Sequence, residues 1–314
     1  MSTGPRGDVI ARGRRSLGLA GASLPNVPFA PAVPPDRQRA AARALEDAGW
    51  PAAWANEGVG GKDVFVQLAL LLSATERIAF ATGVANMWAR PAQTAHGATA
   101  ALAEAFPGRV ALGLGIGYPE QAAAVGQSFA RPLETAREYL RRMHEPVAMS
   151  PAPEVTYPRI LAASGPRMVG LAAEQADGVL TVLVPPEQTA HLRRTIGPEK
   201  LLVVGLSAAV DDDRDAARRA AAAFLSQVVA RPGSPYAANL IRLGYTEADL
   251  VDAAPHAVDA VLGHGRPDDV AAAVQRHLDA GADHVRVNTI APDFDGGVEQ
   301  LLRLGGALGG LRAR

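Results

Sequence analysis

Polar and aromatic residues collect directly after two short, apolar, β-type runs of the chain. Glu57 follows the first of these runs, and Asn86, Trp88 and Arg90 follow the second at alternate positions. If both runs are parallel strands of one barrel, their carboxyl ends meet, and the residues that follow them share one region. A carboxylate in such a place could orient a substrate or move a proton. We therefore expect catalytic roles for Glu57, Asn86 and Arg90. Trp88 would contact the substrate. Capping, ion pairing and plain packing are the alternatives for this set.

A glycine series ends another apolar run. Gly113, Gly115 and Gly117 stand at alternate positions, and Tyr118 follows them. Glycine lets a planar ring or a phosphate approach the backbone closely, because it has no Cβ. The spacing is not a dinucleotide fingerprint, since counting G-x-G-x-x-G from Gly113 puts Tyr118 where the last glycine should be. The pattern indicates either a ligand close to Gly115 or a crowded strand end.

A third cluster combines small, polar and basic residues at an expected strand-to-helix junction. Its members are Ser164, Gly165, Pro166 and Arg167, which open a helical pattern over residues 168–176. Unpaired backbone N–H groups, the helix dipole, a hydroxyl and a guanidinium would converge there, and this combination suits a phosphate. The alternative is an ordinary N-cap with Pro166 in the first helical turn.

Composition removes several function classes. The chain has 314 residues and no cysteine, which excludes disulfides, thiolate metal sites and cysteine nucleophiles and fits a reducing cytoplasm. Its histidines lack metal-ligand spacing, so we expect no metal, and no G-x-S-x-G elbow supports hydrolase chemistry. The formal net charge of −1 argues against nucleic acid and anionic membranes as partners. No run approaches the ~18 apolar residues of a membrane span, so a small-molecule ligand is expected.

Short β-type runs alternate with longer, alanine-rich helical runs, as they do in parallel βα units. The helical run over residues 36–48, for example, places its apolar residues on one face. Eight runs are apolar along their length, as strands buried on both faces should be. They are Ser16–Ala20, Ala52–Ala55, Arg77–Val84, Arg109–Gly115, Arg159–Ala163, Gly178–Val184, Leu201–Ala209 and His284–Ile290. Eight parallel strands predict a (β/α)8 TIM barrel, with an open doubly wound sheet as the alternative.

No linker divides the chain. Residues 1–15 are basic and are expected to be a loose, flexible tail. Residues 16–314 are expected to form a single barrel domain. Within it, Pro232–Val251 is irregular, contains Tyr236 and Tyr245, and is expected to be a loop-helix insertion near the site.

The glycine-rich run and the segment before it resemble a known family. Arg109–Tyr118, preceded by Leu102–Gly108, is similar to a stretch of the luciferase-like monooxygenases and their coenzyme F420-dependent relatives. Arg77–Val84 with Arg90-Pro91 resembles the strand before it. Three further pieces resemble the F420-dependent oxidoreductase subgroup of this superfamily. They are Ile160–Gly178, Pro185–Lys200 and Leu278–Val287.

The resemblance implies both a fold and a cofactor. It implies a luciferase-like barrel whose third strand carries a bulge with a non-prolyl cis peptide, here at Gly83-Val84, backing a flavin-like ring. It also places the phosphate end of the cofactor at Ser164–Arg167. The implied reaction is hydride transfer between the C5 atom of deazaflavin F420 and a small organic substrate held against Trp88, Asn86 and Tyr118.

Other interpretations stay open beside this one. An FMN-dependent monooxygenase using O2 and a separate flavin reductase is the first alternative, and a barrel that binds cofactor without catalysis is the second. Related barrels are often dimers, so a homodimer is a further expectation.

The chain departs from the subgroup at two places. Gly117-Tyr118 stands where those proteins tend to have Ser-His, and Gly21-Ala22 stands where they have a tryptophan. Either Tyr118 takes over proton transfer from that histidine or the chemistry differs. We count Tyr118 as a catalytic and substrate-binding candidate.

Overall fold

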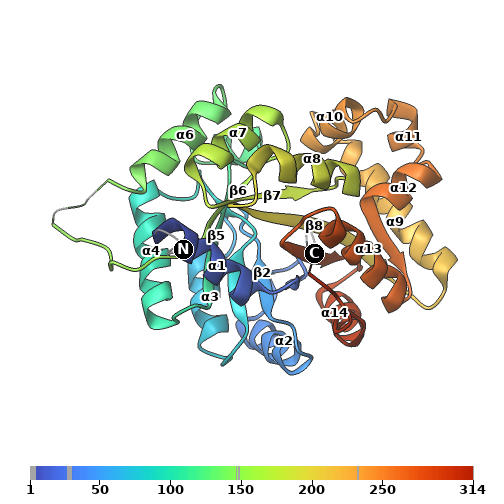
Figure 1. Ribbon diagram of the computed structural model, residues 1–314, viewed down its shortest axis with the longest axis horizontal. Helices are drawn as coiled ribbons and strands as arrows, with labels where there is room; N and C mark the ends of the chain where they lie inside the picture. Colours follow the sequence, from blue (N-terminus) through green and yellow to red (C-terminus); the bar gives the residue numbers. More distant parts are fainter. Residues whose placement is uncertain (1–4, 27–29, 146, 148, 232, 314) are drawn as a thin grey trace.

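Parallel strands close into a barrel in the computed structural model, which describes residues 5–26, 30–145, 147, 149–231 and 233–313 (Figure 1). The barrel strands are β1 (Ala20–Ser23), β2 (Ala52–Ala55), β3 (Ala79–Thr82), β5 (Val110–Gly115), β6 (Arg159–Ala162), β7 (Gly178–Val182), β8 (Leu201–Val210) and β10 (His284–Thr289). They pair in chain order, and the pairing of β10 with both β1 and β8 closes the ring. The predicted (β/α)8 barrel is confirmed, and the open sheet is excluded.

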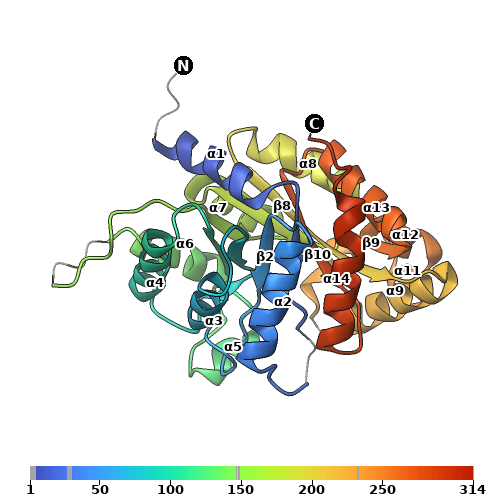
Figure 2. The same cartoon turned by 90° about the horizontal axis from the view of Figure 1, so that it is seen from below.

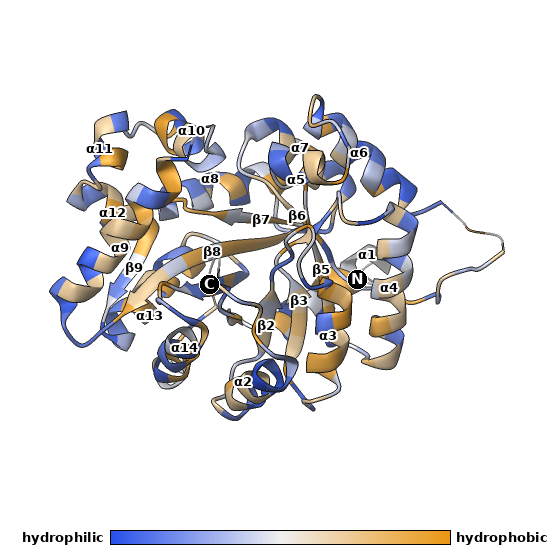
Figure 3. Ribbon diagram, turned by 180° about the vertical axis from the view of Figure 1, so that it is seen from behind, coloured by the Kyte–Doolittle hydropathy of each residue, from blue (hydrophilic) through white to orange (hydrophobic). Residues whose placement is uncertain are grey.

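Helices surround the barrel, and most of them begin with proline in the first turn, where its missing N–H costs no hydrogen bond. They are α2 (Pro35–Asp47), α3 (Val64–Leu72), α4 (Ala92–Ala105), α5 (Pro119–Ala124), α6 (Pro132–Arg142), α7 (Pro166–Gln175), α8 (Pro186–Ile196), α13 (Pro267–Asp279) and α14 (Phe294–Leu308). Figure 3 shows the apolar β8 inside and many hydrophilic residues on the outer helices. The largest apolar cluster lies between strands and helices, as layer packing requires.

The third strand is interrupted at its carboxyl end. The peptide bond Gly83-Val84 is cis, and β4 (Ala85–Asn86) continues beyond it, paired with Leu114 and Gly115 of β5. The cis bond that the family resemblance implied is therefore present. Gly83 and Val84 therefore stand between β3 and β4, at the carboxyl end of the third strand.

The amino-terminal segment corrects a prediction. Residues 5–15 were expected to be a loose tail, but Pro5–Leu17 forms helix α1, and the first strand begins at Ala20 rather than Ser16. Ile10 and Leu17 are buried in the barrel-interior cluster beside Trp54. Figure 2 shows α1 lying across one end of the strands and α5 toward the other. Residues 1–4 of the expected tail lie outside the described residues.

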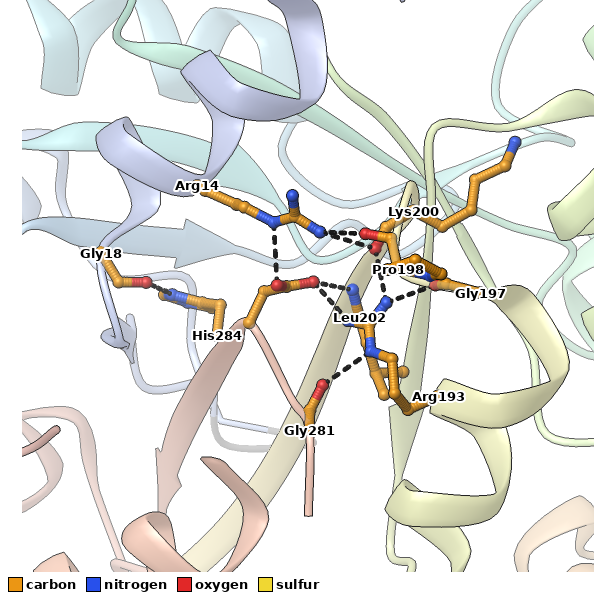
Figure 4. Close-up of polar contacts among 10 residues, drawn as sticks. Arg14, Gly18, Arg193, Gly197, Pro198, Lys200, Leu202, Gly281 and His284 are labelled. Atoms are coloured by element: carbon orange, nitrogen blue, oxygen red, sulfur yellow. Dashed lines mark hydrogen bonds and ion pairs between the residues drawn. The ribbon is translucent and has the colours of Figure 1, made fainter. Parts of the chain in front are cut away.

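Asp283, directly before β10, ties α1 to the barrel. Figure 4 labels its partners Arg14, Arg193 and Leu202. The Asp283 carboxylate accepts hydrogen bonds from Arg14 Nε at 2.9 Å, Arg193 Nη2 at 2.5 Å and the Leu202 backbone N–H at 2.8 Å. Arg14 belongs to α1 and Arg193 to α8, so one carboxylate joins three elements at the amino ends of the strands.

Replacing Asp283 with alanine should lower the free energy of unfolding by about 3 kcal/mol, because it leaves Arg193, whose side chain is 15% exposed, and Arg14, whose side chain is 38% exposed, without this anion. Urea unfolding followed by circular dichroism measures this difference. Asp212→Ala is the control, because the Asp212 carboxylate is 81% exposed in its pair with Arg303. That change should cost under about 1 kcal/mol. Equal effects of the two substitutions would contradict the role given to Asp283.

An extra unit follows β8. It consists of α9 (Arg214–Val229), α10 (Pro235–Arg242), α11 (Glu247–Val251), α12 (Pro255–Val261) and strand β9 (Leu262–Gly265), around an apolar cluster of its own. β9 was not predicted, because its sequence Leu-Gly-His-Gly resembles a turn. It pairs with Ser207–Val210 at the end of β8, beyond the last pairing of β7 with Gly205. The unit therefore rises at the carboxyl end of the barrel.

Among the described residues, no helix has both the length and the apolar character needed to cross a bilayer.

Candidate functional site

A pocket of about 400 Å³ lies at the carboxyl ends of the strands. This volume is within the ~300–1,000 Å³ that small-molecule sites usually span. Its lining comes from the ends of several strands and from α10. The lining residues are Asn56, Gly83, Val84, Gly115, Ile116, Gly117, Tyr118, Ala162, Ala163, Ser164, Gly165, Met168, Leu180, Val182, Pro235, Tyr236 and Arg286. Six residues proposed from the sequence meet here: Gly83, Val84, Gly115, Tyr118, Ser164 and Gly165.

Two glycines of the pocket lining are closely packed against neighbouring side chains. A Cβ on Gly115 would lie 2.4 Å from Cγ2 of Val84, and a Cβ on Gly83 would lie 2.3 Å from Nη1 of Arg286. Both contacts are too short for real atoms, so glycine is required at these positions. The two glycines therefore let the side chains of Val84 and Arg286, which also line the pocket, pack directly against the backbone at the ends of β3 and β5.

The amino end of α7 also lines the pocket, through Ser164 and Gly165. Gly165 is its N-cap with Pro166 in the first turn, which is the ordinary N-cap given as the alternative, and no side chain caps the helix, so its first N–H groups have no side-chain acceptor. Gly165 has no atom within 4 Å of the place of a Cβ, which leaves room for a ligand. Pro166 stands in the first turn as expected and is exposed, and the Arg167 side chain is exposed outside the pocket lining.

A different arginine reaches the Ser164 loop. Nη2 of Arg242, at the end of α10, donates to the Ser164 carbonyl at 3.0 Å and also to Oδ1 of Asn239. The unit between β8 and β9 therefore contacts the β6–α7 loop directly. Positive charge at this loop comes from Arg242 as well as from Arg167.

Tyr118 lies at the mouth of the pocket beneath α10. Its hydroxyl donates to the hydroxyl of Tyr236 at 3.0 Å, and the guanidinium of Arg231 lies 5.0 Å from its ring centre. Burial raises the pKa of Tyr118 above its ordinary value, and Tyr236 adds to the increase. The phenol is therefore protonated at neutral pH and acts as a hydrogen-bond donor rather than as a base.

Glu57 and Arg90 form a buried ion pair behind the cis bulge. The Glu57 side chain is 2% exposed and that of Arg90 is 10% exposed, with Glu57 Oε2 at 2.8 Å from Arg90 Nη1. The same carboxylate accepts the backbone N–H of Asn86 at 2.8 Å and that of Val64 at 3.2 Å. Burial alone would lower the pKa of Arg90, but pairing with Glu57 and Asp63 outweighs it and raises that pKa.

Asn86 and Trp88 are also engaged away from the pocket. Asn86 donates from Nδ2 to Gln121 at 3.0 Å and accepts the Trp88 backbone N–H at Oδ1, and the Trp88 indole donates to the Ile116 carbonyl at 2.5 Å. Trp88 and Arg90 line a separate hollow of about 820 Å³ near α4 and α6. Glu57, Asn86, Trp88 and Arg90 are thus brought together, but not into the lining of the 400 Å³ pocket.

The sequence analysis missed Arg286 and Asn56, which line the pocket, and named Tyr236, which also lines it, only as part of an insertion near the site. Arg286 stands on β10 and donates to the Gly83 carbonyl at 2.5 Å, to Oδ1 of Asn56 at 3.1 Å and to the Ser23 hydroxyl. It is only 8% exposed. A charged residue between Val285 and Val287 of a buried strand was the available signal.

Comparison with known proteins agrees with this geometry. The sequence profile of the luciferase-like monooxygenase family matches residues 15–284. The chain is 28% identical over 295 residues to a 5,10-methylenetetrahydromethanopterin reductase of Archaeoglobus fulgidus, covering 79% of this chain and 88% of the relative.

Solved structures show the same fold. An F420-dependent secondary alcohol dehydrogenase in complex with an F420-acetone adduct superposes with a TM-score of 0.71 at 16% identity, covering 92% of this chain and 98% of that one. The FMN-bound oxygenating constituent of 3,6-diketocamphane monooxygenase from Pseudomonas putida gives 0.69 at 16% identity, covering 94% and 100%. Because the family profile matches most of this chain, the chain belongs to the luciferase-like monooxygenase family.

Proposed function

We propose that this protein is a coenzyme F420-dependent oxidoreductase that transfers hydride between the deazaflavin C5 and a small organic substrate. The observation that carries the proposal is that Gly83, Val84 and Gly115, at the ends of β3 and β5, line one pocket with Ser164 and Gly165 at the amino end of α7. A planar ring with a phosphate-bearing chain fits a pocket that joins close-packed strand ends to an anion-favouring helix terminus. The cofactor would supply the hydride chemistry, which no side chain here provides.

The chain's own residues have separate tasks in this proposal. Gly83, Val84 and Gly115 would support the ring, while Leu180 and Val182 keep water from it. Ser164, Gly165, Pro166 and Arg167, with Arg242 beside them, would hold the phosphate.

The substrate would bind at the mouth of the pocket. The protonated Tyr118 would exchange its hydrogen bond to Tyr236 for one to the substrate, or pass the substrate a proton. Trp88 would support the substrate side from behind the lining. Catalytic roles for Glu57, Asn86 and Arg90 stay predictions, and their contacts favour positioning of β4 and the cis bulge.

The names of similar proteins support a deazaflavin cofactor and leave FMN as the alternative cofactor. F420 appears in the description of the alcohol dehydrogenase structure, and FMN appears in that of the diketocamphane enzyme. An FMN-dependent monooxygenase, working with O2 and a separate reductase, is therefore the second candidate. Oxygen consumption during turnover would identify it. A barrel that binds cofactor without turnover is the third, and the Tyr118 departure supports it.

Equilibrium fluorescence titration of the purified apoprotein with oxidised F420 and, separately, with FMN tests the proposal. We expect saturable F420 binding at micromolar or lower concentration. Gly115→Ala should weaken it about tenfold or more, because the added methyl group collides with Val84. Ser164→Ala and Arg167→Met should weaken it as well.

Gly170→Ala is the matched control, because Gly170 of α7 has open space where a Cβ would go. It should leave the affinity unchanged. Selective FMN binding would favour the monooxygenase, and binding of neither cofactor would refute the proposal.

The proposal also includes the oligomeric state of the protein and the compartment in which it acts. We propose a homodimer through the outer helices, since Val66 and Leu70 of α3 are apolar and 61% and 38% exposed. The proposed site of action is the cytoplasm, and the proposed partner is a small-molecule substrate.

A further inference from the structure

We propose that Arg286 is a positioning residue that makes the pocket select the more negatively charged form of its ligand. The inference rests on the proposed function, because that ligand is the F420 or FMN ring. It concerns a residue to which the family resemblance assigned no role, and which stands between Val285 and Val287 of the buried core.

Arg286 reaches across the barrel mouth. It starts from β10 and contacts groups at or after the ends of three other strands: the Ser23 hydroxyl of β1, Oδ1 of Asn56 after β2, and the Gly83 carbonyl after β3. Its guanidinium also lies 5.9 Å from the Trp54 ring centre. These contacts fix the cation in the lining of the pocket, next to Gly83.

The charge of this arginine is not balanced locally. All three of its hydrogen-bond partners are neutral, and across the described part of the chain no carboxylate lies within ion-pair distance of it. Burial lowers the pKa of Arg286 to about 10, which still leaves it charged at neutral pH. Buried charges are normally paired, because an isolated one is expensive to desolvate.

The guanidinium also retains hydrogen-bonding capacity. Of its five N–H groups, one on each terminal nitrogen has no acceptor among the residues that the structure describes. An anionic ligand edge would satisfy both the charge and the remaining donors. A negative charge on the bound ligand would therefore balance the positive charge of Arg286.

This property matches hydride chemistry. Hydride carries two electrons and one proton, so a ring that accepts it gains one negative charge unless a further proton follows. The phosphate and tail are the same before and after that change, so they do not distinguish the two forms. A fixed cation at the ring would favour the reduced form over the oxidised one.

The test compares the dissociation constants of oxidised and chemically reduced F420, measured anaerobically at pH 8 by fluorescence titration and equilibrium dialysis. Wild-type protein should bind the reduced form about tenfold or more tightly than the oxidised form. Arg286→Gln keeps a donor for the Gly83 carbonyl but removes the charge, and should abolish this ratio. Arg286→Lys should restore most of it, whereas a purely structural role would change both affinities equally.

Arg218→Met is the control, since Arg218 is half exposed and pairs with Asp259 away from the pocket. It should leave both constants unchanged. If the wild type binds F420 but Arg286→Gln keeps the wild-type ratio, the inference is overturned while the proposed function stands. If the wild type prefers FMN, oxidised and reduced FMN replace F420 in the same comparison. Binding of neither cofactor overturns the proposed function and the inference together. If circular dichroism shows the Gln variant unfolded, equal wild-type affinities for the two forms still overturn the inference.

Discussion

Glu57→Gln should lower the free energy of unfolding by about 3–5 kcal/mol, the usual cost of removing one partner from a buried ion pair. The amide would leave Arg90, 10% exposed, with Asp63 as its remaining anion, and the Asp63 side chain is 47% exposed. It would also weaken the bond that fixes the Asn86 backbone of β4. Urea unfolding followed by circular dichroism measures the change.

The same variant separates a positioning role for Glu57 from a catalytic one. If Glu57 is a positioning residue, the substitution lowers stability and the folded fraction still binds cofactor. If Glu57 is a catalytic residue, the substitution lowers turnover and leaves stability unchanged. Glu104→Gln is the control. Glu104 is exposed on α4, so this substitution also replaces a carboxylate with an amide but does not affect a buried ion pair. Wild-type stability in Glu57→Gln would contradict the positioning role.

The barrel was predictable because its signal is local. Strands buried on both faces are continuous apolar runs, and seven of the eight ranges overlap the observed strands over most of their length. The first run failed, since Leu17 belongs to α1 and the strand starts at Ala20. The apolar residues of α1, Val9, Ile10 and Leu17, follow helical spacing, but the arginines between them resemble a solvated tail.

The pocket was predictable only where one short segment carried the whole signal. Gly115, Ser164 and Gly165 could be identified because strand ends and helix starts have their own residue patterns, whereas Pro166 and Arg167 of the same prediction lie outside the lining. Arg286 could not, because its significance depends on Ser23, Asn56 and Gly83, which lie far from it in sequence. The Glu57–Arg90 pair shows the same limit, since residue types place both near a barrel mouth without telling which way they point.

Lowering the pH from 7.5 to 5 should reduce the free energy of unfolding by about 4 kcal/mol through two buried histidines, His277 and His284. Burial lowers the pKa of each from 6.5 to about 4. Between these values the unfolded chain binds protons that the folded chain does not. The free energy of unfolding is therefore highest above pH 6.5 and decreases as the pH falls toward 4. At pH 5 the decrease is about 2 kcal/mol for each histidine.

The contacts of His284 explain why it resists protonation. Its Nε2 accepts the Trp54 indole N–H at 3.0 Å, so the proton is on Nδ1, which faces the Gly18 carbonyl at 2.9 Å. Protonation would place a second hydrogen between Nε2 and the indole, next to the Arg286 cation. His277 has one such contact, with the Thr189 hydroxyl at 2.9 Å.

Urea titrations at pH 7.5 and pH 5 test this account, because the carboxylates with lowered pKa values, such as Glu46 and Asp63, lose their contribution only at lower pH. His284→Gln should be less stable than wild type at pH 7.5 and should lose about 2 kcal/mol less on acidification, and His277→Gln should behave in the same way. His191→Gln, at an exposed position of α8, should keep the wild-type slope. A wild-type slope in both buried-site variants would mean that other groups control acid stability. The link to the site is that Trp54 contacts both His284 and Arg286, so protonation of His284 would disturb the residue beneath the proposed anion position.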